Sequence, residues 1–159
     1  ILGRDNKKIN DYIDEMTGFG FNIIKVKNSS ELCKIANLIV TTTTANESLI
    51  RKSDINPGTH ITAVGSDTPG KRELDPEILG MAHCLVVDSI PQCLERGETK
   101  YALDLGLIKQ DDLIELGEII ANGDKARSDQ NDITVADLTG VAVQDIMITN
   151  TVYNNLNNK

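Results

Sequence analysis

The sequence has few aromatic residues: two Phe, three Tyr and no Trp among 159 residues. A domain of this length with 40% hydrophobic residues can bury a core, but that core must be aliphatic. An aliphatic core is typical of a parallel sheet covered by helices. The length fits one domain, or one domain with an appendage.

Basic residues are also scarce, since 16 Lys and Arg stand against 24 Asp and Glu and give a net charge of −8. Binding to a nucleic-acid backbone requires clustered Lys and Arg, so we expect no nucleic-acid partner. The acidity is interpreted as a contribution to solubility. No apolar run approaches the length of a membrane span and no signal peptide is visible, so we expect no membrane association.

The three cysteines, Cys33, Cys84 and Cys93, are an odd number without CxxC spacing. We expect buried free thiols and a reducing, cytoplasmic location. Neither His60 nor His83 stands at ligand spacing to a cysteine, so we expect no metal site.

Short apolar segments alternate with amphipathic ones along the chain, which is typical of repeated βαβ units and predicts a Rossmann-like, doubly wound parallel α/β sheet. The expected strands are residues 1–3, 21–26, 38–40, 60–64, 84–87 and 133–136, and the strand at 38–40 is expected to be buried. The expected helices are residues 5–15, 91–96 and 111–120, and segments that begin near residues 29, 75 and 142. The tail from residue 154 is expected to fray.

Acidic residues follow several of these strands. Asp67 comes two residues after Gly65, at the end of a β-branched strand. In open α/β sheets, ligands bind beyond the carboxyl ends of the strands, so Asp67 is a candidate for proton transfer or for holding a substrate ammonium. The other interpretation is an Asx turn that caps the next segment. Asp88 and Asp137 also end strands and rank below Asp67.

Further side chains near strand ends have two interpretations each. Arg4 either accepts the 2′-phosphate of NADP or is a surface residue of a first helical turn. The hydroxyls of residues 41–44 either line a cofactor site or reflect β-propensity and turn chemistry. Lys71 binds phosphate, pairs with Asp67 or Glu73, or is simply solvated.

A set of segments in a fixed order carries a resemblance. They are TTTT after a strand, PGTHITAVGSDTPGKRELD, VVDS followed by QC and GE, ELGE, and ITVADLTGVAVQD. In this order they resemble the ornithine cyclodeaminase/mu-crystallin family over residues 38–145, and more loosely back to Gly3 and Arg4. The segments AVGSDTPGKRELD and DLTGVAVQD are specific to that family.

The resemblance implies a Rossmann domain that binds NAD or NADP, and a second domain that forms a dimer and part of the substrate pocket. It implies hydride exchange at the α-carbon of an amino acid or imine, as in ornithine cyclodeamination (a lyase activity), ketimine reduction or amino-acid dehydrogenation. The expected partners are a small amino-acid or imine substrate and a second copy of the chain. The alternative is a non-catalytic, crystallin-like protein that binds NADP or another small ligand.

The resemblance also assigns roles to residues. Asp67 matches the catalytic aspartate, which handles the proton of the substrate amine or of water. Arg4 stands where ornithine-specific members have an acid, which indicates NADP. Thr139 matches a substrate-binding position. The positions that match cofactor contacts are Thr42 or Thr43, Val64, Gly65, Ser66, Lys71 and Leu138.

Two parts of the family pattern are absent from these residues. One is the N-terminal region with basic substrate-binding residues. The other is the glycine-rich strand–turn–helix that cradles pyrophosphate, because Gly18 and Gly20 end a helix and do not open one. In the strand order 3-2-1-4-5-6 the strand of that motif is central, so residues 1–3 and 38–40 would lack a partner between them.

These absences predict the organisation of the chain. We expect residues 1–140 to form a partial NAD(P)-binding domain and residues 141–159 a C-terminal helix that returns toward the substrate and dimerisation domain. Because the chain begins at Ile1 rather than Met, we expect it to be the C-terminal half of a protein roughly twice as long, as the six-strand order requires. These residues alone are expected to be inactive and to bind dinucleotide weakly.

Overall fold

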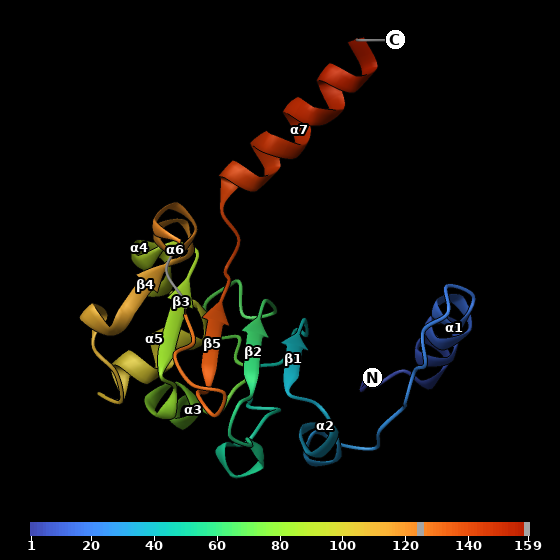
Figure 1. The fold of residues 1–159 in the computed structure, drawn as a ribbon, viewed down its shortest axis with the longest axis horizontal. Helices are drawn as coiled ribbons and strands as arrows, with labels where there is room; N and C mark the ends of the chain where they lie inside the picture. Colours follow the sequence, from blue (N-terminus) through green and yellow to red (C-terminus); the bar gives the residue numbers. More distant parts are fainter. Residues whose placement is uncertain (124–125, 158–159) are drawn as a thin grey trace.

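A computed structural model describes residues 1–123 and 126–157. Its centre is a five-stranded sheet in the order β1-β2-β5-β3-β4 (Figure 1). Every strand pair is parallel, which confirms the predicted α/β class. The strands are β1 (Leu38–Thr41), β2 (His60–Ala63), β3 (Cys84–Val87), β4 (Leu113–Glu115) and β5 (Thr134–Asp137).

The helices are α1 (Asn6–Thr17), α2 (Ser29–Ile35), α3 (Pro76–Met81), α4 (Ile90–Cys93), α5 (Gly97–Asp104), α6 (Leu116–Asn122) and α7 (Ala142–Asn157), with the short 3-10 helices η1 (Lys52–Asp54) and η2 (Gln110–Asp112). Helices α3 to α6 lie in the connections between successive strands, α1 and α2 precede β1, and α7 follows β5. Among the described residues, no helix has both the length and the apolar character that crossing a bilayer requires.

One face of the sheet carries the core. Side chains alternate between the two faces of a strand, and Ile39, Ile61, Leu85 and Val135 all project to the same face. There they join buried residues of α2, α3, α4 and α5, such as Ile78, in a single hydrophobic cluster. No buried residue of this cluster is aromatic, which confirms the predicted aliphatic core.

The strand at residues 38–40 was predicted to be buried, and this was wrong. Leu38 and Val40 are 61% and 58% exposed, while Ile39 between them is buried. The reason is that β1 lies at the edge of the sheet and pairs only with β2 in the part of the chain that the structure describes. An edge strand can bury one face and leave the other open.

The prediction of two strands before residue 30 was also wrong. Residues 1–3 and 21–26 are extended, but they form no strand and are joined by only two hydrogen bonds. The Ile1 ammonium donates to the Ile24 carbonyl (2.6 Å), and the Val26 amide donates to the Ile1 carbonyl (3.1 Å). Helix α1 between them was predicted correctly, with Ile9 buried.

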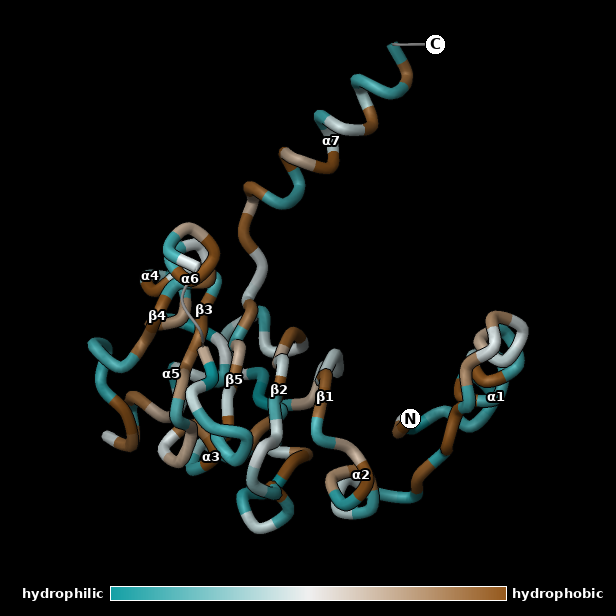
Figure 2. The backbone as a smooth tube through the Cα atoms, in the orientation of Figure 1, coloured by the Kyte–Doolittle hydropathy of each residue, from teal (hydrophilic) through white to brown (hydrophobic). Residues whose placement is uncertain are grey.

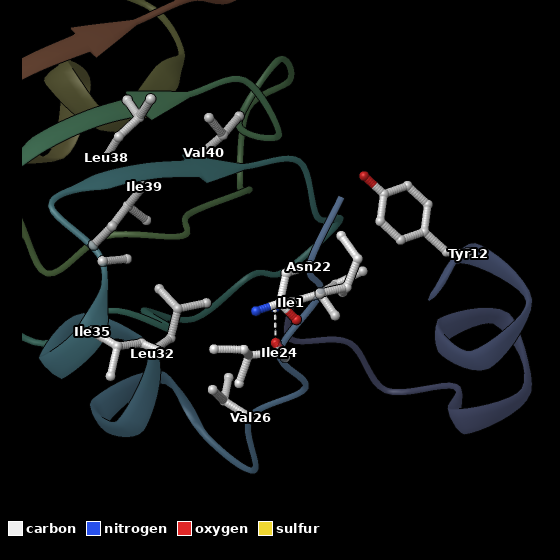
Figure 3. A pocket seen from close by; sticks show the side chains of 12 residues that line it. Ile1, Tyr12, Asn22, Ile24, Val26, Leu32, Ile35, Leu38, Ile39 and Val40 are labelled. Atoms are coloured by element: carbon white, nitrogen blue, oxygen red, sulfur yellow. Dashed lines mark hydrogen bonds between the residues drawn. The ribbon is translucent and has the colours of Figure 1, made fainter. Parts of the chain in front are cut away.

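A groove of about 400 Å³ separates this N-terminal segment from β1 (Figure 3). Ile1, Ile24 and Val26 line one side, and Leu32, Leu38 and Val40 line the other. The sequence predicted a missing neighbour between residues 1–3 and residues 38–40, and the groove lies at that position.

Two predicted helices have different boundaries. Residues 111–120 were expected to form one helix, but Leu113–Glu115 forms β4, which pairs with β3 and satisfies backbone groups along the edge of β3. Helix α6 follows and ends at Asn122, with left-handed backbone at its C-cap, Gly123. The helix predicted over residues 91–96 is α4, which ends at Cys93, and Gly97 opens a further helix, α5, with a φ of 87°.

Helix α7 was predicted from residue 142 and begins there, but it continues to Asn157 where fraying was expected. It extends away from the sheet, and hydrophobic positions recur along it (Figure 2). Its apolar residues, including Val143, Ile146 and Met147, are all exposed. Its predicted return toward a second domain stays a prediction.

Candidate functional site

β1, β2 and β5 are neighbouring parallel strands, so their C-terminal ends lie along one edge of the sheet. The Val64 amide donates to the Thr41 carbonyl, and the Leu138 amide donates to the Ala63 carbonyl, each at 2.9 Å. These bonds extend the parallel pairing of β1, β2 and β5 one residue beyond the strands. The predicted residues after β1, β2 and β5 are therefore brought together at the edge where α/β sheets bind ligands.

Asp67 and Lys71 form an ion pair on the loop after β2. The Lys71 ammonium lies 2.6 Å from the Asp67 carboxylate, and the two side chains are 24% and 50% exposed. The hydrogen bond from Lys71 is the main cause of the lowered pKa of Asp67. Ser66 is buried, and its hydroxyl donates to the Lys71 carbonyl at 2.7 Å, which fixes the loop between them.

The other strand-end acids point into the protein. Asp137 is 2% exposed, and its carboxylate accepts the Thr99 amide at 2.8 Å, near the start of α5. Burial raises the pKa of Asp137 to about 6. Asp88 accepts the Gly140 amide at 2.6 Å and so holds the turn after β5. Among these three acids, Asp67 alone has an exposed side chain at the edge.

The positions assigned to the cofactor differ in exposure. Thr42 and Thr43 are exposed beyond β1, and Val64 is 40% exposed and offers an apolar surface beyond β2. Thr139, assigned to substrate binding, is 5% exposed. Its hydroxyl donates to Asp88 at 3.2 Å, so it faces the turn and not the open edge.

The sequence did not identify Glu73 and Glu98 as site residues, although both are buried carboxylates near this edge. Glu73 accepts the amides of Thr43 and Gly65, and Glu98 accepts the amides of Glu73 and Leu74. Burial raises the pKa of Glu98 to about 8, although the two amide bonds act in the opposite direction. Their place in the segments GKRELD and RGETK is their one signal in the sequence.

Arg4 lies apart from this edge, in the exposed stretch that leads into α1. Its neighbour Asp5 caps α1 and accepts the amides of Lys7 and Lys8. The Asp5 carboxylate is therefore already engaged with the helix backbone.

The three cysteines are free thiols, as predicted, and Cys33 and Cys93 are buried, but Cys84 is half-buried, so its predicted burial was wrong. Burial is the main cause of the raised pKa of each thiol. Within residues 1–123 and 126–157, His, Cys, Asp and Glu side chains form no group of three that could hold a metal ion.

Comparison with known proteins decides the family. The profile of the ornithine cyclodeaminase/mu-crystallin family matches residues 1–159. The chain belongs to that family. It is 39% identical over 120 residues to the alanine dehydrogenase of Archaeoglobus fulgidus, and this match covers 75% of the chain and 37% of that relative.

Solved structures of family proteins have the same fold. An archaeal alanine dehydrogenase dimer with bound NAD superposes with a TM-score of 0.85 at 33% identity, over 94% of the chain and 46% of that structure. The Thermococcus litoralis Δ1-pyrroline-2-carboxylate reductase, in complex with NADH and L-proline, gives 0.81 at 30% identity, over 89% and 44%. The chain thus spans less than half the length of these relatives.

Proposed function

We propose that the chain contributes the nicotinamide side of the active site in an NAD(P)-dependent oxidoreductase or cyclodeaminase that acts on an amino acid or imine. The observation that carries this proposal is the exposed Asp67 carboxylate beside Lys71, at the edge shared by β1, β2 and β5. The enzymes to which the chain is similar act on such substrates or bind them, as their names state.

The described residues fit one half of a dinucleotide. Gly65 and half-exposed Val64 offer backbone and apolar surface beyond β2, where a flat nicotinamide ring would lie against them. Leu138 after β5 and the exposed Thr42 and Thr43 after β1 border the same space. When bound, the cofactor would supply or accept the hydride.

Asp67 would act on the substrate itself. Its lowered pKa keeps it a carboxylate at neutral pH, so it can hold a substrate ammonium or accept a proton from an amine or from water. Lys71 would orient this carboxylate and contact the cofactor. The turn held by Asp88, which contains Thr139, would form the wall beside the substrate.

NADP is the proposed cofactor, although solved relatives contain NAD or NADH. Asp5 is engaged in capping α1 and is less available to a ribose hydroxyl. Arg4, which is exposed next to it, would then face a 2′-phosphate with a charge-assisted hydrogen bond.

We also propose a homodimer in the cytoplasm. The exposed apolar residues of α7 support an assembled state, because such residues are seldom left in water along a whole helix. Residues 142–157 would return toward a substrate and dimerisation domain, and residues 1–140 would form the nucleotide-binding part. Three free thiols are in keeping with a reducing compartment.

The test is turnover. In the longer enzyme to which these residues are proposed to belong, NADPH and NADH oxidation would be measured with cyclic imines and with 2-oxo acids plus ammonia, and cofactor reduction with alanine. Turnover of ornithine would be followed by the release of ammonia, because its cyclodeamination to proline consumes no net cofactor. Turnover of one of these classes supports the proposal. Cofactor binding without turnover of any of them would favour a crystallin-like binding protein.

A further inference from the structure

Glu73 is a fully buried carboxylate that joins two of the loops at the site. Its exposed fraction is 0%. One carboxylate oxygen accepts the amide of Thr43, after β1, at 2.5 Å, and the other accepts the amide of Gly65, after β2, at 3.0 Å. Each oxygen therefore holds the first turn of a different loop.

The two loops are in direct backbone contact at this point. A Cβ atom built on Gly65 would lie 2.2 Å from the Thr43 carbonyl oxygen and 2.6 Å from the Glu73 carboxyl carbon. A side chain therefore cannot be placed there without moving a loop. The separation of the two loops is set by the carboxylate between them.

Glu73 is itself held from two other directions. Its amide donates to Glu98, at the start of α5, at 2.7 Å. Its carbonyl accepts the amides of Leu49 at 2.7 Å and Ile50 at 3.1 Å. Because its backbone is fixed to α5 and to residues 49–50, the carboxylate acts as a fixed point for the loops.

We propose that Glu73 is a positioning residue, which sets the distance between the loop of Thr43 and the loop of Asp67. This inference rests on the proposed function, since it assigns those loops to cofactor and substrate. The role needs a carboxylate, because both oxygens accept an N–H. In Glu73→Gln one oxygen becomes an NH2 group that faces a backbone donor.

The experiment is amide hydrogen exchange, followed residue by residue by 15N NMR in the whole chain. In the wild type, the Thr43 and Gly65 amides should exchange slowly although both lie outside the strands. In Glu73→Gln at least one of the two, the amide left facing the NH2 group, should exchange about 10- to 100-fold faster, the usual effect of losing a hydrogen bond to a charged group. Amides within β2 and β5 should be unchanged, and the carboxyl 13C shift of Asp67 should move.

The matched control is Glu77→Gln, at an exposed acid four residues further along that pairs with Lys52. It should leave the Thr43 and Gly65 amides and the Asp67 signal as in the wild type. Fast exchange of these two amides in the wild type would overturn the inference without reference to any variant. Uniform loss of protection across the sheet in Glu73→Gln would also overturn it, because Glu73 would then support the fold in general.

The exchange measurement does not depend on turnover. A longer enzyme, containing these residues, without activity on any imine or amino acid would refute the proposed function, and the exchange rates in the chain would still decide whether Glu73 joins the loops. Where turnover is present, Glu73→Gln should lower kcat more than it raises KM for the substrate.

Discussion

The ammonium of Lys71 lies 2.6 Å from the carboxylate of Asp67, and the pair is partly open to solvent. The interaction lowers the pKa of Asp67, so the carboxylate is ionised at neutral pH and is a base or an anchor rather than an acid. A substrate ammonium that binds here would share the carboxylate with Lys71. The pair therefore connects the proposed chemistry to the side chain that is proposed to contact the cofactor.

In the longer enzyme to which these residues are proposed to belong, Asp67→Asn should reduce turnover by about 10²- to 10⁴-fold, the usual effect of removing a positioned acid or base. Affinity for the dinucleotide should change little, because Asp67 is proposed to act on the substrate. Steady-state kinetics and cofactor titration would measure the two effects. Asp104→Asn is the matched control, since Asp104 and Lys100 form another exposed pair four residues apart. Near-normal turnover in Asp67→Asn would refute the assignment.

In the longer enzyme to which these residues are proposed to belong, Arg4→Asp should shift cofactor preference from NADPH toward NADH by about 10- to 100-fold, the effect of losing one charge-assisted hydrogen bond. The ratio of kcat/KM for the two cofactors measures it. Arg51→Asp, at another exposed arginine, is the control and should leave the ratio unchanged. A wild type that prefers NADH by a wide margin would show that Arg4 is only a surface residue.

The 159 residues should bind NADPH and NADH more weakly than micromolar. Pyrophosphate normally rests on the amides of a helix that follows a glycine-rich turn, and this sequence contains no such strand–turn–helix. Apart from Arg4, whose proposed partner is the 2′-phosphate that NADH lacks, the contacts proposed here reach the nicotinamide half, so nicotinamide mononucleotide should bind about as well as NADH. Calorimetry would measure all three, and micromolar binding of a dinucleotide would contradict this argument.

The sequence predicted the strands that lie inside the sheet better than those at its edges. The strand at Cys84–Val87 was predicted with the observed bounds, because a short apolar run is buried on both sides there. Leu113–Glu115 was taken for part of a helix because its residues carry no β-pattern of their own. They become a strand because β3 offers them backbone partners. Such pairing depends on tertiary structure and is not encoded locally.

The site residues likewise divide into those with a local sequence pattern and those whose role depends on tertiary structure. Asp67 was found because a strand, a glycine and a single acid form a local pattern. Glu73 was not found as a site residue, because its role depends on amides 30 and 8 residues away along the chain. From the sequence alone, an acidic residue between the basic and apolar residues of KREL is expected to be exposed to solvent.

Through Glu98, the stability of the folded chain should fall as pH rises from about 4.5 to about 8, against an opposite contribution from His60, whose pKa is lowered by burial. Burial raises the pKa of Glu98 from 4.5 to about 8, so within this window the folded state binds a proton that the unfolded state has released. Asp137, with its pKa raised to about 6, acts with the same sign at the lower end. Denaturant titrations at pH 5.5 and 8 should show this decline.

Glu98→Gln should make that decline shallower, because the variant has no titrating group at this position. Glu95→Gln, at an exposed acid in the turn before α5, should retain the wild-type slope. Equal slopes in all three proteins would show that Glu98 titrates alike in the folded and unfolded states.

Gly65→Ala should destabilise the fold by about 1–3 kcal/mol, the usual cost of adding a methyl group where there is no space. The new Cβ would meet the Thr43 carbonyl oxygen at 2.2 Å and the Glu73 carboxyl at 2.6 Å, and neither can move without breaking the contact between the loops. Gly117→Ala is the matched control: Gly117 lies within α6, and a Cβ there meets nothing within 4 Å. Because alanine favours a helix over glycine by up to about 1 kcal/mol, this control should be neutral or stabilising. Urea unfolding would compare them, and a Gly65→Ala variant as stable as the wild type would show that the loops after β1 and β2 are not held in contact.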